Sequence, residues 1–224
     1  MDTMSTHFET LSIHAGGEGK NPKNALNYPI FMTSTFEFDY VEHADATFGF
    51  ETQDYVYTRG NNPTLKLLEE RMAVLEGGAA SVAFASGMAA ISSVLMSLLK
   101  PGDEVVAHRV LYGSAWNFIK NILPRYGVNS RMVNLASIGD LADQIGDRTK
   151  VIYFETPTNP GLDIIDIAAV CDAARARGVK VVVDNTFATP FFQRPLELGA
   201  DVVVHSATKY ISGHGDVIAG IAVA

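Results

Sequence analysis

A lysine near position 209 follows a short apolar segment in a pattern that suggests amine chemistry. Residues 202–204 are all valine, which predicts a strand buried on both faces of a sheet. Ser206, Thr208 and Lys209 come directly after it. A lysine at the edge of an apolar core loses solvation, which favours its neutral, nucleophilic amine, and the two hydroxyls could bind a phosphate beside it. Taken alone, a solvated lysine after a strand explains the same pattern.

Two further segments could supply an anion and a phosphate site where an expected strand ends or an expected helix begins. Asp184 ends the apolar run 181–183, at the edge where open α/β sheets bind ligands. Ser86, Gly87 and Met88 open an apolar helix whose free N–H groups and dipole suit a phosphate. Each has a plainer alternative, because an aspartate often caps a turn and glycine often starts a helix. Together they provide a phosphate cradle, an anion and an amine.

These three groups are what pyridoxal phosphate (PLP) requires of a protein. The cofactor needs a lysine for covalent attachment and a carboxylate that keeps its pyridine nitrogen protonated, so that the ring accepts electrons. On these motifs, and on the run His205-Ser-Ala-Thr-Lys-Tyr-Ile-Ser-Gly-His-Gly-Asp216, the chain resembles the Cys/Met-metabolism family of PLP enzymes. Within that family the methionine γ-lyase group is the most similar. The resemblance runs from about Leu11 to Ala224 and implies the aspartate-aminotransferase fold.

The resemblance also implies roles for individual residues. Tyr112 would stack on the cofactor ring and donate a proton to the leaving group, and Asn159 would bond the phenolic oxygen. Tyr57 and Arg59 would cross a dimer interface to the phosphate of the neighbouring subunit. Without the resemblance, these residues are explained as a half-buried aromatic, a turn before a proline and a solvated turn. The implied cofactor-binding set is Tyr57, Arg59, Ser86, Gly87, Met88, Tyr112, Asn159, Asp184, Ser206, Thr208 and Lys209.

The expected reaction is α,γ-elimination of L-methionine or a related sulfur amino acid. Lys209 would remove the Cα proton, Asp184 would keep the ring nitrogen protonated, and Tyr112 would protonate the departing thiolate. Ser114 departs from the pattern, because methionine γ-lyases usually have cysteine there and related enzymes have glycine. Replacement at the γ-carbon, as in O-acetylhomoserine sulfhydrylase or cystathionine γ-synthase, and cystathionine cleavage therefore stay as alternatives.

The elements that would position these residues alternate along the chain. Apolar strands near 104, 129, 150, 180, 202 and 217 alternate with helices, which predicts right-handed β-α-β units and a mostly parallel sheet. We expect a three-layer α/β/α large domain over residues 61–224, preceded by an N-terminal arm, residues 1–60, that reaches a neighbouring subunit of a dimer of dimers.

The family's smaller C-terminal domain, which supplies the arginine for the substrate carboxylate, has no counterpart up to Ala224. The sequence is therefore expected to be one piece of a longer polypeptide or to be completed by a second chain. A non-catalytic, PLP-binding fragment or subunit is the alternative of another class.

Composition excludes several classes of partner. A net charge of −8 without a basic cluster argues against nucleic acids and anionic membranes. A single cysteine and a polar N-terminus predict a reducing, cytoplasmic location. His205 and His214 have no partner at a metal-ligand spacing, so we expect no metal site.

Overall fold

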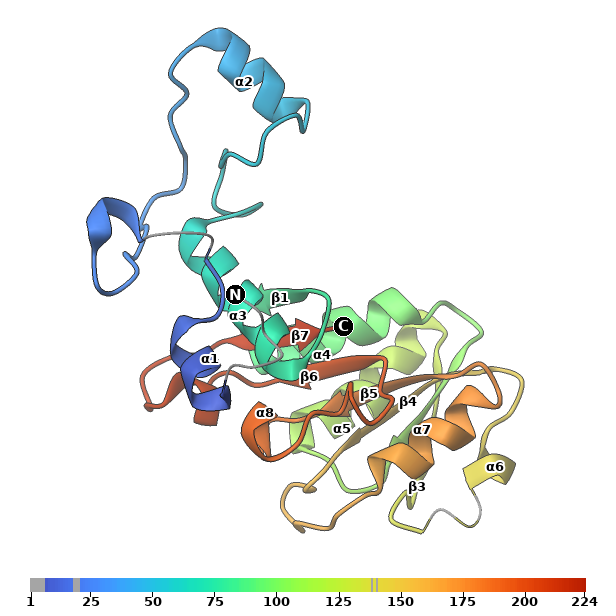
Figure 1. Ribbon diagram of the computed structural model, residues 1–224. Coiled ribbons are helices and arrows are strands. Elements are labelled where there is room, and N and C mark those ends of the chain that lie inside the picture. Colours follow the sequence, from blue (N-terminus) through green and yellow to red (C-terminus); the bar gives the residue numbers. More distant parts are fainter. Residues whose placement is uncertain (1–6, 18–20, 138, 140) are drawn as a thin grey trace. The chain divides into compact units, whose positions relative to one another are not determined.

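The computed structural model describes residues 7–17, 21–137, 139 and 141–224. These residues form two compact units, Met1–Arg71 and Met72–Ala224, and each is described by itself (Figure 1). The first unit contains helices α1 (Phe8–His14) and α2 (Val41–Phe48), neither of which the weak periodicity of this segment predicts. Helix α3 (Pro63–Glu76) runs from the first unit into the second.

The second unit is built on a seven-stranded sheet in the order β1-β7-β6-β5-β4-β2-β3. Five strands run parallel to their neighbours, whereas β7 is antiparallel to both β1 and β6. This arrangement confirms the predicted, mostly parallel α/β fold. Strand β1 was not expected, and β7 begins later than the predicted position near 217. The strands are β1 (Ser81–Phe84), β2 (Glu104–His108), β3 (Asn129–Val133), β4 (Thr149–Glu155), β5 (Lys180–Asp184), β6 (Val202–His205) and β7 (Gly220–Val223).

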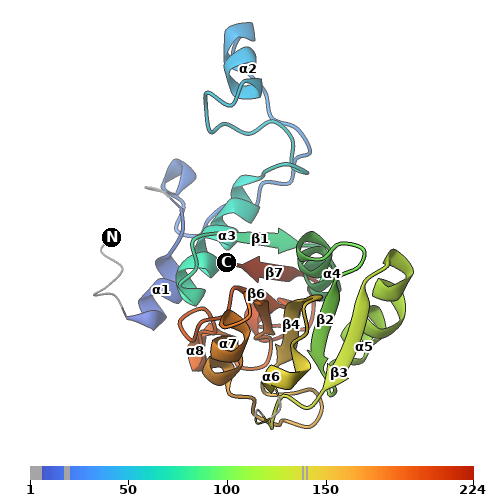
Figure 2. The same cartoon turned by 90° about the vertical axis from the view of Figure 1, so that its right-hand side faces the viewer.

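The core consists of two layers, one on each face of the sheet, because side chains along each strand point alternately to the two faces. Tyr153 and Val182 pack with helices α4 (Gly87–Leu98) and α5 (Gly113–Asn117), whereas Phe154 and Val183 pack with α6 (Leu141–Gln144) and α7 (Ile167–Arg175). Side chains of successive strand residues point to opposite faces, so each strand supplies both layers. Figure 2 shows α4 and α5 on one side of the sheet and α6 and α7 on the other. The second unit therefore has the expected three-layer α/β/α architecture.

The remaining short helices of the described residues are η2 (Pro22–Asn24) in the first unit and η3 (Phe118–Ile122), η4 (Leu123–Tyr126), α8 (Thr189–Phe192) and η6 (Tyr210–Ser212) in the second. Helices η3 and η4 continue α5, so this part of the chain passes through α, π and 3₁₀ turns in succession. Among the helices of the described residues, none has the length and apolar character needed to cross a membrane.

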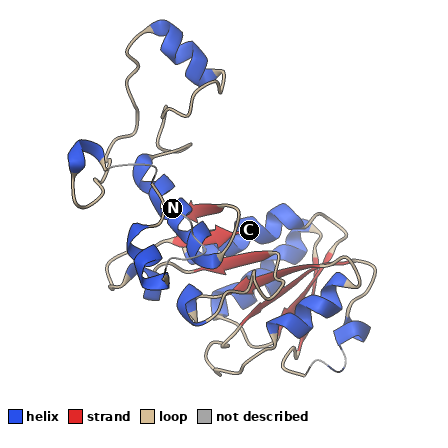
Figure 3. Cartoon of the chain, in the orientation of Figure 1, coloured by secondary structure: helices blue, strands red, loops and turns tan. Residues whose placement is uncertain are grey.

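The direction of the strands brings distant segments to one edge of the sheet. Strands β1, β2, β4, β5 and β6 share a direction, because β1 and β6 are both antiparallel to the β7 strand between them. The segments that follow these strands therefore leave the sheet at the same edge, as the strand arrows in Figure 3 show. Open α/β sheets bind ligands at this edge.

Candidate active site

Asp184 ends β5 as a buried carboxylate whose two oxygens both accept hydrogen bonds. Oδ1 accepts from the backbone N–H of Thr186 (3.0 Å) and from its hydroxyl (2.5 Å), and Oδ2 accepts from the Tyr153 hydroxyl (3.3 Å). Burial raises the pKa of Asp184, while the bonds from Thr186, the positive charge of His205 and the Tyr153 bond act to lower it. The carboxylate is therefore held in one orientation by the chain's own residues.

Glu155 is a second buried carboxylate at this edge, and the sequence interpretation missed it. It ends β4 directly opposite Asp184 in the parallel register and accepts the backbone N–H of Tyr112. Burial raises the pKa of Glu155 to about 8, and the charge of Asp184 adds to the rise, whereas the N–H groups of Tyr112 and Asn159 lower it. Glu155 thus ties together the two loops that carry Tyr112 and Asn159. A carboxylate at the end of a buried strand, the signal used for Asp184, was also present here.

The start of α4 lies against the end of β6. Ser86 caps the helix, with its Oγ accepting the N–H of Ala89 (3.1 Å). The N–H groups of Gly87 and Met88 belong to the first turn, where an α-helix supplies no acceptor. A Cβ on Gly87 would lie 2.7 Å from the Cβ of Ser206, so only glycine permits this contact. The backbone N–H of Ser206 in turn bonds the Thr186 hydroxyl (2.8 Å), which connects this corner to Asp184.

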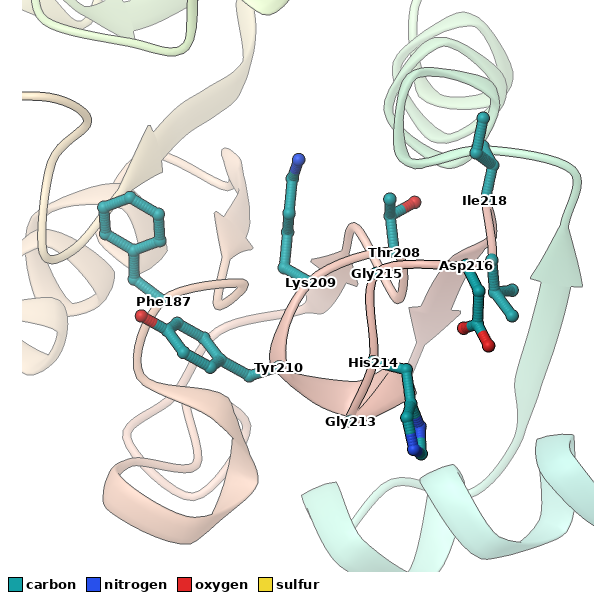
Figure 4. Close-up of a pocket in the computed structure, with 10 residues that line it drawn as sticks. Phe187, Thr208, Lys209, Tyr210, Gly213, His214, Gly215, Asp216 and Ile218 are labelled. Atoms are coloured by element: carbon teal, nitrogen blue, oxygen red, sulfur yellow. The ribbon is translucent and has the colours of Figure 1, made fainter.

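Lys209 lies in the turn after β6, and its surroundings differ from the sequence expectation. Its side chain is exposed and lines an open cavity of about 770 Å³ with residues that include Phe187, Tyr210 and His214. In Figure 4 the Lys209 side chain points away from His214 and to the same side as the Thr208 hydroxyl. The expected loss of solvation is therefore not provided by the described residues, because β6 ends four residues earlier and the turn leaves the core.

Thr208 is also more constrained than the sequence suggests. Its hydroxyl donates to the carbonyl of Ala219 (3.1 Å) and accepts the N–H of the same residue (3.1 Å). The side chain thus fastens the lysine turn to the segment that enters β7. The hydroxyl proton is already donated to the Ala219 carbonyl, so the hydroxyl would have to give up this bond in order to donate to a phosphate.

Tyr112 and Asn159 keep their side chains accessible. Tyr112 is the residue before α5 and is 46% exposed, with its backbone held by Glu155 and its ring free of the core. Asn159 is half-buried in the loop after β4. Both lie at the carboxyl edge of the sheet with Asp184, as the motifs predict.

Tyr57 and Arg59 belong to the first unit. The guanidinium carbon of Arg59 lies 5.5 Å from the ring centroid of Tyr57, and both residues line a cavity of about 500 Å³ with Phe48 and Phe50. Their predicted role at a neighbouring subunit's cofactor involves a second chain, so that role stays a prediction.

His205 and His214, the two histidines weighed as metal ligands from the sequence, each contact a polar partner. The His205 Nε2 lies 2.6 Å from a Glu76 carboxylate oxygen, and His214 bonds Ser212. In the described ranges, no group of three or more His, Cys, Asp or Glu side chains could hold a metal ion.

Comparison with known proteins identifies relatives of the whole described chain. The family model for Cys/Met metabolism PLP-dependent enzymes matches residues 9–224. L-methionine gamma-lyase of Pseudomonas putida is 51% identical over 96% of this chain and 54% of its own length. The crystal structure of metB from Corynebacterium glutamicum matches with a TM-score of 0.92 and 41% identity, over 100% of this chain and 56% of that one.

A third relative is metY from Campylobacter jejuni, assigned as an O-acetylhomoserine (thiol)-lyase. Its TM-score is 0.91 and its identity 33%, over 98% of this chain and 54% of that chain, and its structure contains N'-pyridoxyl-lysine-5'-monophosphate. The chain described here spans about half the length of the curated relatives that it matches.

Proposed function

Because the chain belongs to the Cys/Met metabolism PLP-dependent enzymes, we propose that it forms the cofactor-binding part of a carbon–sulfur lyase. The proposed reaction is α,γ-elimination of L-methionine or a related sulfur amino acid to a 2-oxo acid, ammonia and a thiol. The observation that carries the proposal is the single sheet edge that holds Asp184, Lys209 and the start of α4, in a chain half identical to a methionine γ-lyase.

The residues at this edge fit PLP. Gly87 packs so closely on Ser206 that no Cβ would fit between them, which brings the first-turn N–H groups of Gly87 and Met88 beside Ser206, where a phosphate could bind. Asp184 presents a carboxylate fixed by Thr186, as an anionic partner for a pyridinium nitrogen requires. We assign the phosphate to Ser86, Gly87, Met88, Ser206 and Thr208, the ring to Tyr112 and Asp184, the phenolic oxygen to Asn159 and the covalent attachment to Lys209.

Bound PLP supplies an electron sink that stabilises negative charge at the substrate Cα. In the proposed mechanism the Lys209 Nζ takes the Cα proton, and its exposed position gives the amine room to approach and withdraw. Asp184, whose pKa is raised by burial and lowered by the bonds from Thr186, would be the residue that keeps a proton at the ring nitrogen. The phenol of Tyr112, accessible at the start of α5, gives its proton to the leaving sulfur.

Replacement at the γ-carbon is the second candidate, and Ser114 leaves the choice between elimination and replacement open. This residue lies exposed in α5, two positions after Tyr112, where the methionine γ-lyase group usually has cysteine. Elimination and replacement share their early steps and differ in whether a thiol or sulfide adds before the product leaves. Cystathionine cleavage is a further member of this set.

Product analysis separates these reactions. The complete protein, supplied with PLP, would be incubated with methionine and separately with an acyl-homoserine ester, each with and without sulfide. Elimination predicts a 2-oxo acid and a thiol from methionine without sulfide. Homocysteine formed from the ester only with sulfide would replace the lyase assignment with a sulfhydrylase, and PLP binding without product would support the non-catalytic alternative.

We further propose that the active site is shared between subunits of a homodimer, with two dimers forming a tetramer. The segment 1–60 would act as an arm that brings Tyr57 and Arg59 to the neighbouring subunit's phosphate, while residues 61–224 form the cofactor domain. The exposed apolar side chains of the segment 1–60 support its role as an arm, since Leu26, Met32 and Phe50 are each at least 90% exposed in the single chain.

Subunit mixing tests the shared site. Arg59→Ala and Lys209→Ala would each be inactive alone. In a mixed dimer one shared site carries both changes and the other carries neither, so part of the activity returns. If Arg59 serves its own chain, every site keeps one change and mixing restores nothing.

A further inference from the structure

A buried polar cluster lies behind the candidate site and is used by none of the roles assigned above. Its centre is Glu76, the last residue of α3, which is completely buried. One carboxylate oxygen, Oε1, receives the Nε2 of His205 at 2.6 Å and the Nδ2 of Asn185 at 2.9 Å. Asn185 Oδ1 accepts from Gln193 Nε2 (2.8 Å), which also donates to the carbonyl of Thr156 (2.6 Å).

The cluster holds the strand ends that carry the site. Asn185 directly follows Asp184, and His205 directly precedes Ser206. Because successive strand residues alternate between faces and Asp184 pairs with Val204, His205 is on the opposite side of the sheet from Asp184. Glu76 therefore fastens the ends of β5 and β6 to each other from the face that a cofactor would not occupy.

Burying the carboxylate of Glu76 together with the imidazole of His205 costs desolvation free energy that an apolar contact would not. The side chains of Glu76 and His205 are both 0% exposed, and their 2.6 Å separation is typical of a charge-assisted hydrogen bond. Within the described residues, Glu76 Oε2 and His205 Nδ1 have no hydrogen-bond partner. The attraction within a buried ion pair recovers only part of the desolvation cost of its two charges. Well-packed apolar residues in the same place often stabilise a core equally well or better. An ion pair at this position therefore suggests a task beyond packing.

We propose that Glu76 is a positioning residue for the cofactor site, which holds His205 and Asn185 at the ends of β6 and β5 and places the His205 imidazole behind the Asp184 carboxylate. A protonated imidazole at this position favours the ionised form of Asp184, the form that can hold a proton at the ring nitrogen. The charge of His205 indeed opposes the burial that raises the pKa of Asp184. This inference rests on the proposed binding of PLP.

The test compares Glu76→Gln with Glu104→Gln in the complete protein. Glu104 is a matched control, because it also forms an ion pair, with Arg131, and accepts a bond from Thr149, yet it starts β2 at the other edge of the sheet. Three quantities would be measured for each: the free energy of unfolding, the Kd for PLP and the ¹⁵N resonance of the pyridine nitrogen of bound ¹⁵N-labelled PLP. The last reports directly whether that nitrogen carries a proton.

We expect Glu76→Gln to weaken PLP binding about 10- to 100-fold, the range in which residues that orient ligand-binding groups act. Its ring-nitrogen resonance should move toward the unprotonated position, whereas Glu104→Gln should lose stability with both readouts unchanged. His205→Gln keeps an N–H donor but removes the positive charge, so it should shift the resonance even if Glu76→Gln does not fold. Wild-type Kd and resonance in the folded Glu76 or His205 variant would overturn the inference. Failure of the wild-type protein to bind PLP would instead reject the proposed function.

Discussion

Asp184 and Lys209 leave neighbouring strands at one edge of the sheet, but their surroundings differ in burial and in bonding. Asp184 is 7% exposed and accepts bonds from Thr186 and Tyr153. Lys209 is exposed, and its amine forms no hydrogen bond among the described residues. In the proposed mechanism the anion keeps one orientation, and the chain fixes that orientation. The amine would approach the substrate, take a proton and withdraw, and the chain leaves it room to do so.

The largest effect expected from this difference follows the change Lys209→Ala. Turnover of the complete protein should fall by at least about 10²–10⁴-fold, the contribution of one positioned acid–base group. Borohydride reduction of the wild-type holoenzyme and peptide mapping should place the pyridoxyl group on Lys209. Lys150→Ala is the control, since Lys150 bonds only the nearby Asp147 carbonyl at the opposite edge of the sheet. A label on another lysine would show that the mobile amine has been misidentified.

Asp184→Asn tests the fixed side of the comparison. The variant should still bind PLP, but turnover should fall by roughly 10²–10³-fold, the cost of removing one preorganised electrostatic group. The reason is that a neutral amide cannot hold the proton at the ring nitrogen. If Asp184 only capped the turn at Thr186, kcat would stay near the wild-type value and the loss would be about 0.5–2 kcal/mol of stability.

Glu155 predicts how stability changes with pH. The pKa of Glu155 is about 8 in the folded protein, whereas its ordinary value, which applies to the unfolded chain, is 4.5. Between these two pH values the folded state therefore binds more protons than the unfolded state. The free energy of unfolding should therefore fall as pH rises from about 5 to about 8. Glu155→Gln should reduce this fall by roughly 2–4 kcal/mol, at about 1.4 kcal/mol per pKa unit.

Urea unfolding of the apoprotein over this pH range provides the measurement. The amide of the variant can still accept the Tyr112 N–H, so a change in slope reports titration rather than a lost contact. An unchanged slope in the Glu155→Gln variant would assign the pH dependence to other groups.

The smallest effect concerns the support of Asp184 by Tyr153. Tyr153→Phe removes one 3.3 Å bond and leaves Asp184 Oδ2 without that donor. We expect a loss of about 0.5–1.5 kcal/mol in the free energy of unfolding and a change in kcat of less than about tenfold. Tyr126→Phe, at an exposed position, is the control. Equal stability of the two variants would mean that the Thr186 bonds alone orient the carboxylate.

The sequence predicted the elements whose pattern is local. The valine runs that became β5 and β6 and the glycine that opens α4 could be interpreted without any partner, because periodicity and helix-start chemistry depend on neighbours in the chain. The strand β1 was missed because it is short and its Val82 is 52% exposed, so it carries no buried apolar run. The exposure of Lys209 was missed because nothing local shows where a turn leaves the core.

The buried carboxylate of Glu76 could not be predicted from local sequence in the same way. Glu76 ends an amphipathic helix, where a charged residue usually faces solvent, and its partners Asn185 and His205 lie 109 and 129 residues later. Only the crossing of β5, β6 and α3 in space shows that this charge is buried. The motifs thus selected the residues that we propose to touch the cofactor, whereas the Glu76 cluster behind them could be found only in the structure.

The position of β7 between β1 and β6 also sets the timing of events during synthesis. Strand β1 has β7 as its one neighbour in the sheet, with Ser81 opposite Val223, and Gly220 packs against the backbone carbonyl of Ser86. At translation rates of about 5–20 residues per second, β1 and the start of α4 wait on the order of ten seconds for this strand. During that interval the nascent chain exposes an unpaired strand edge and a helix start that lacks its final packing partner, so chaperone contacts on the ribosome are expected to concentrate on residues 81–98 and to end once residue 223 has emerged.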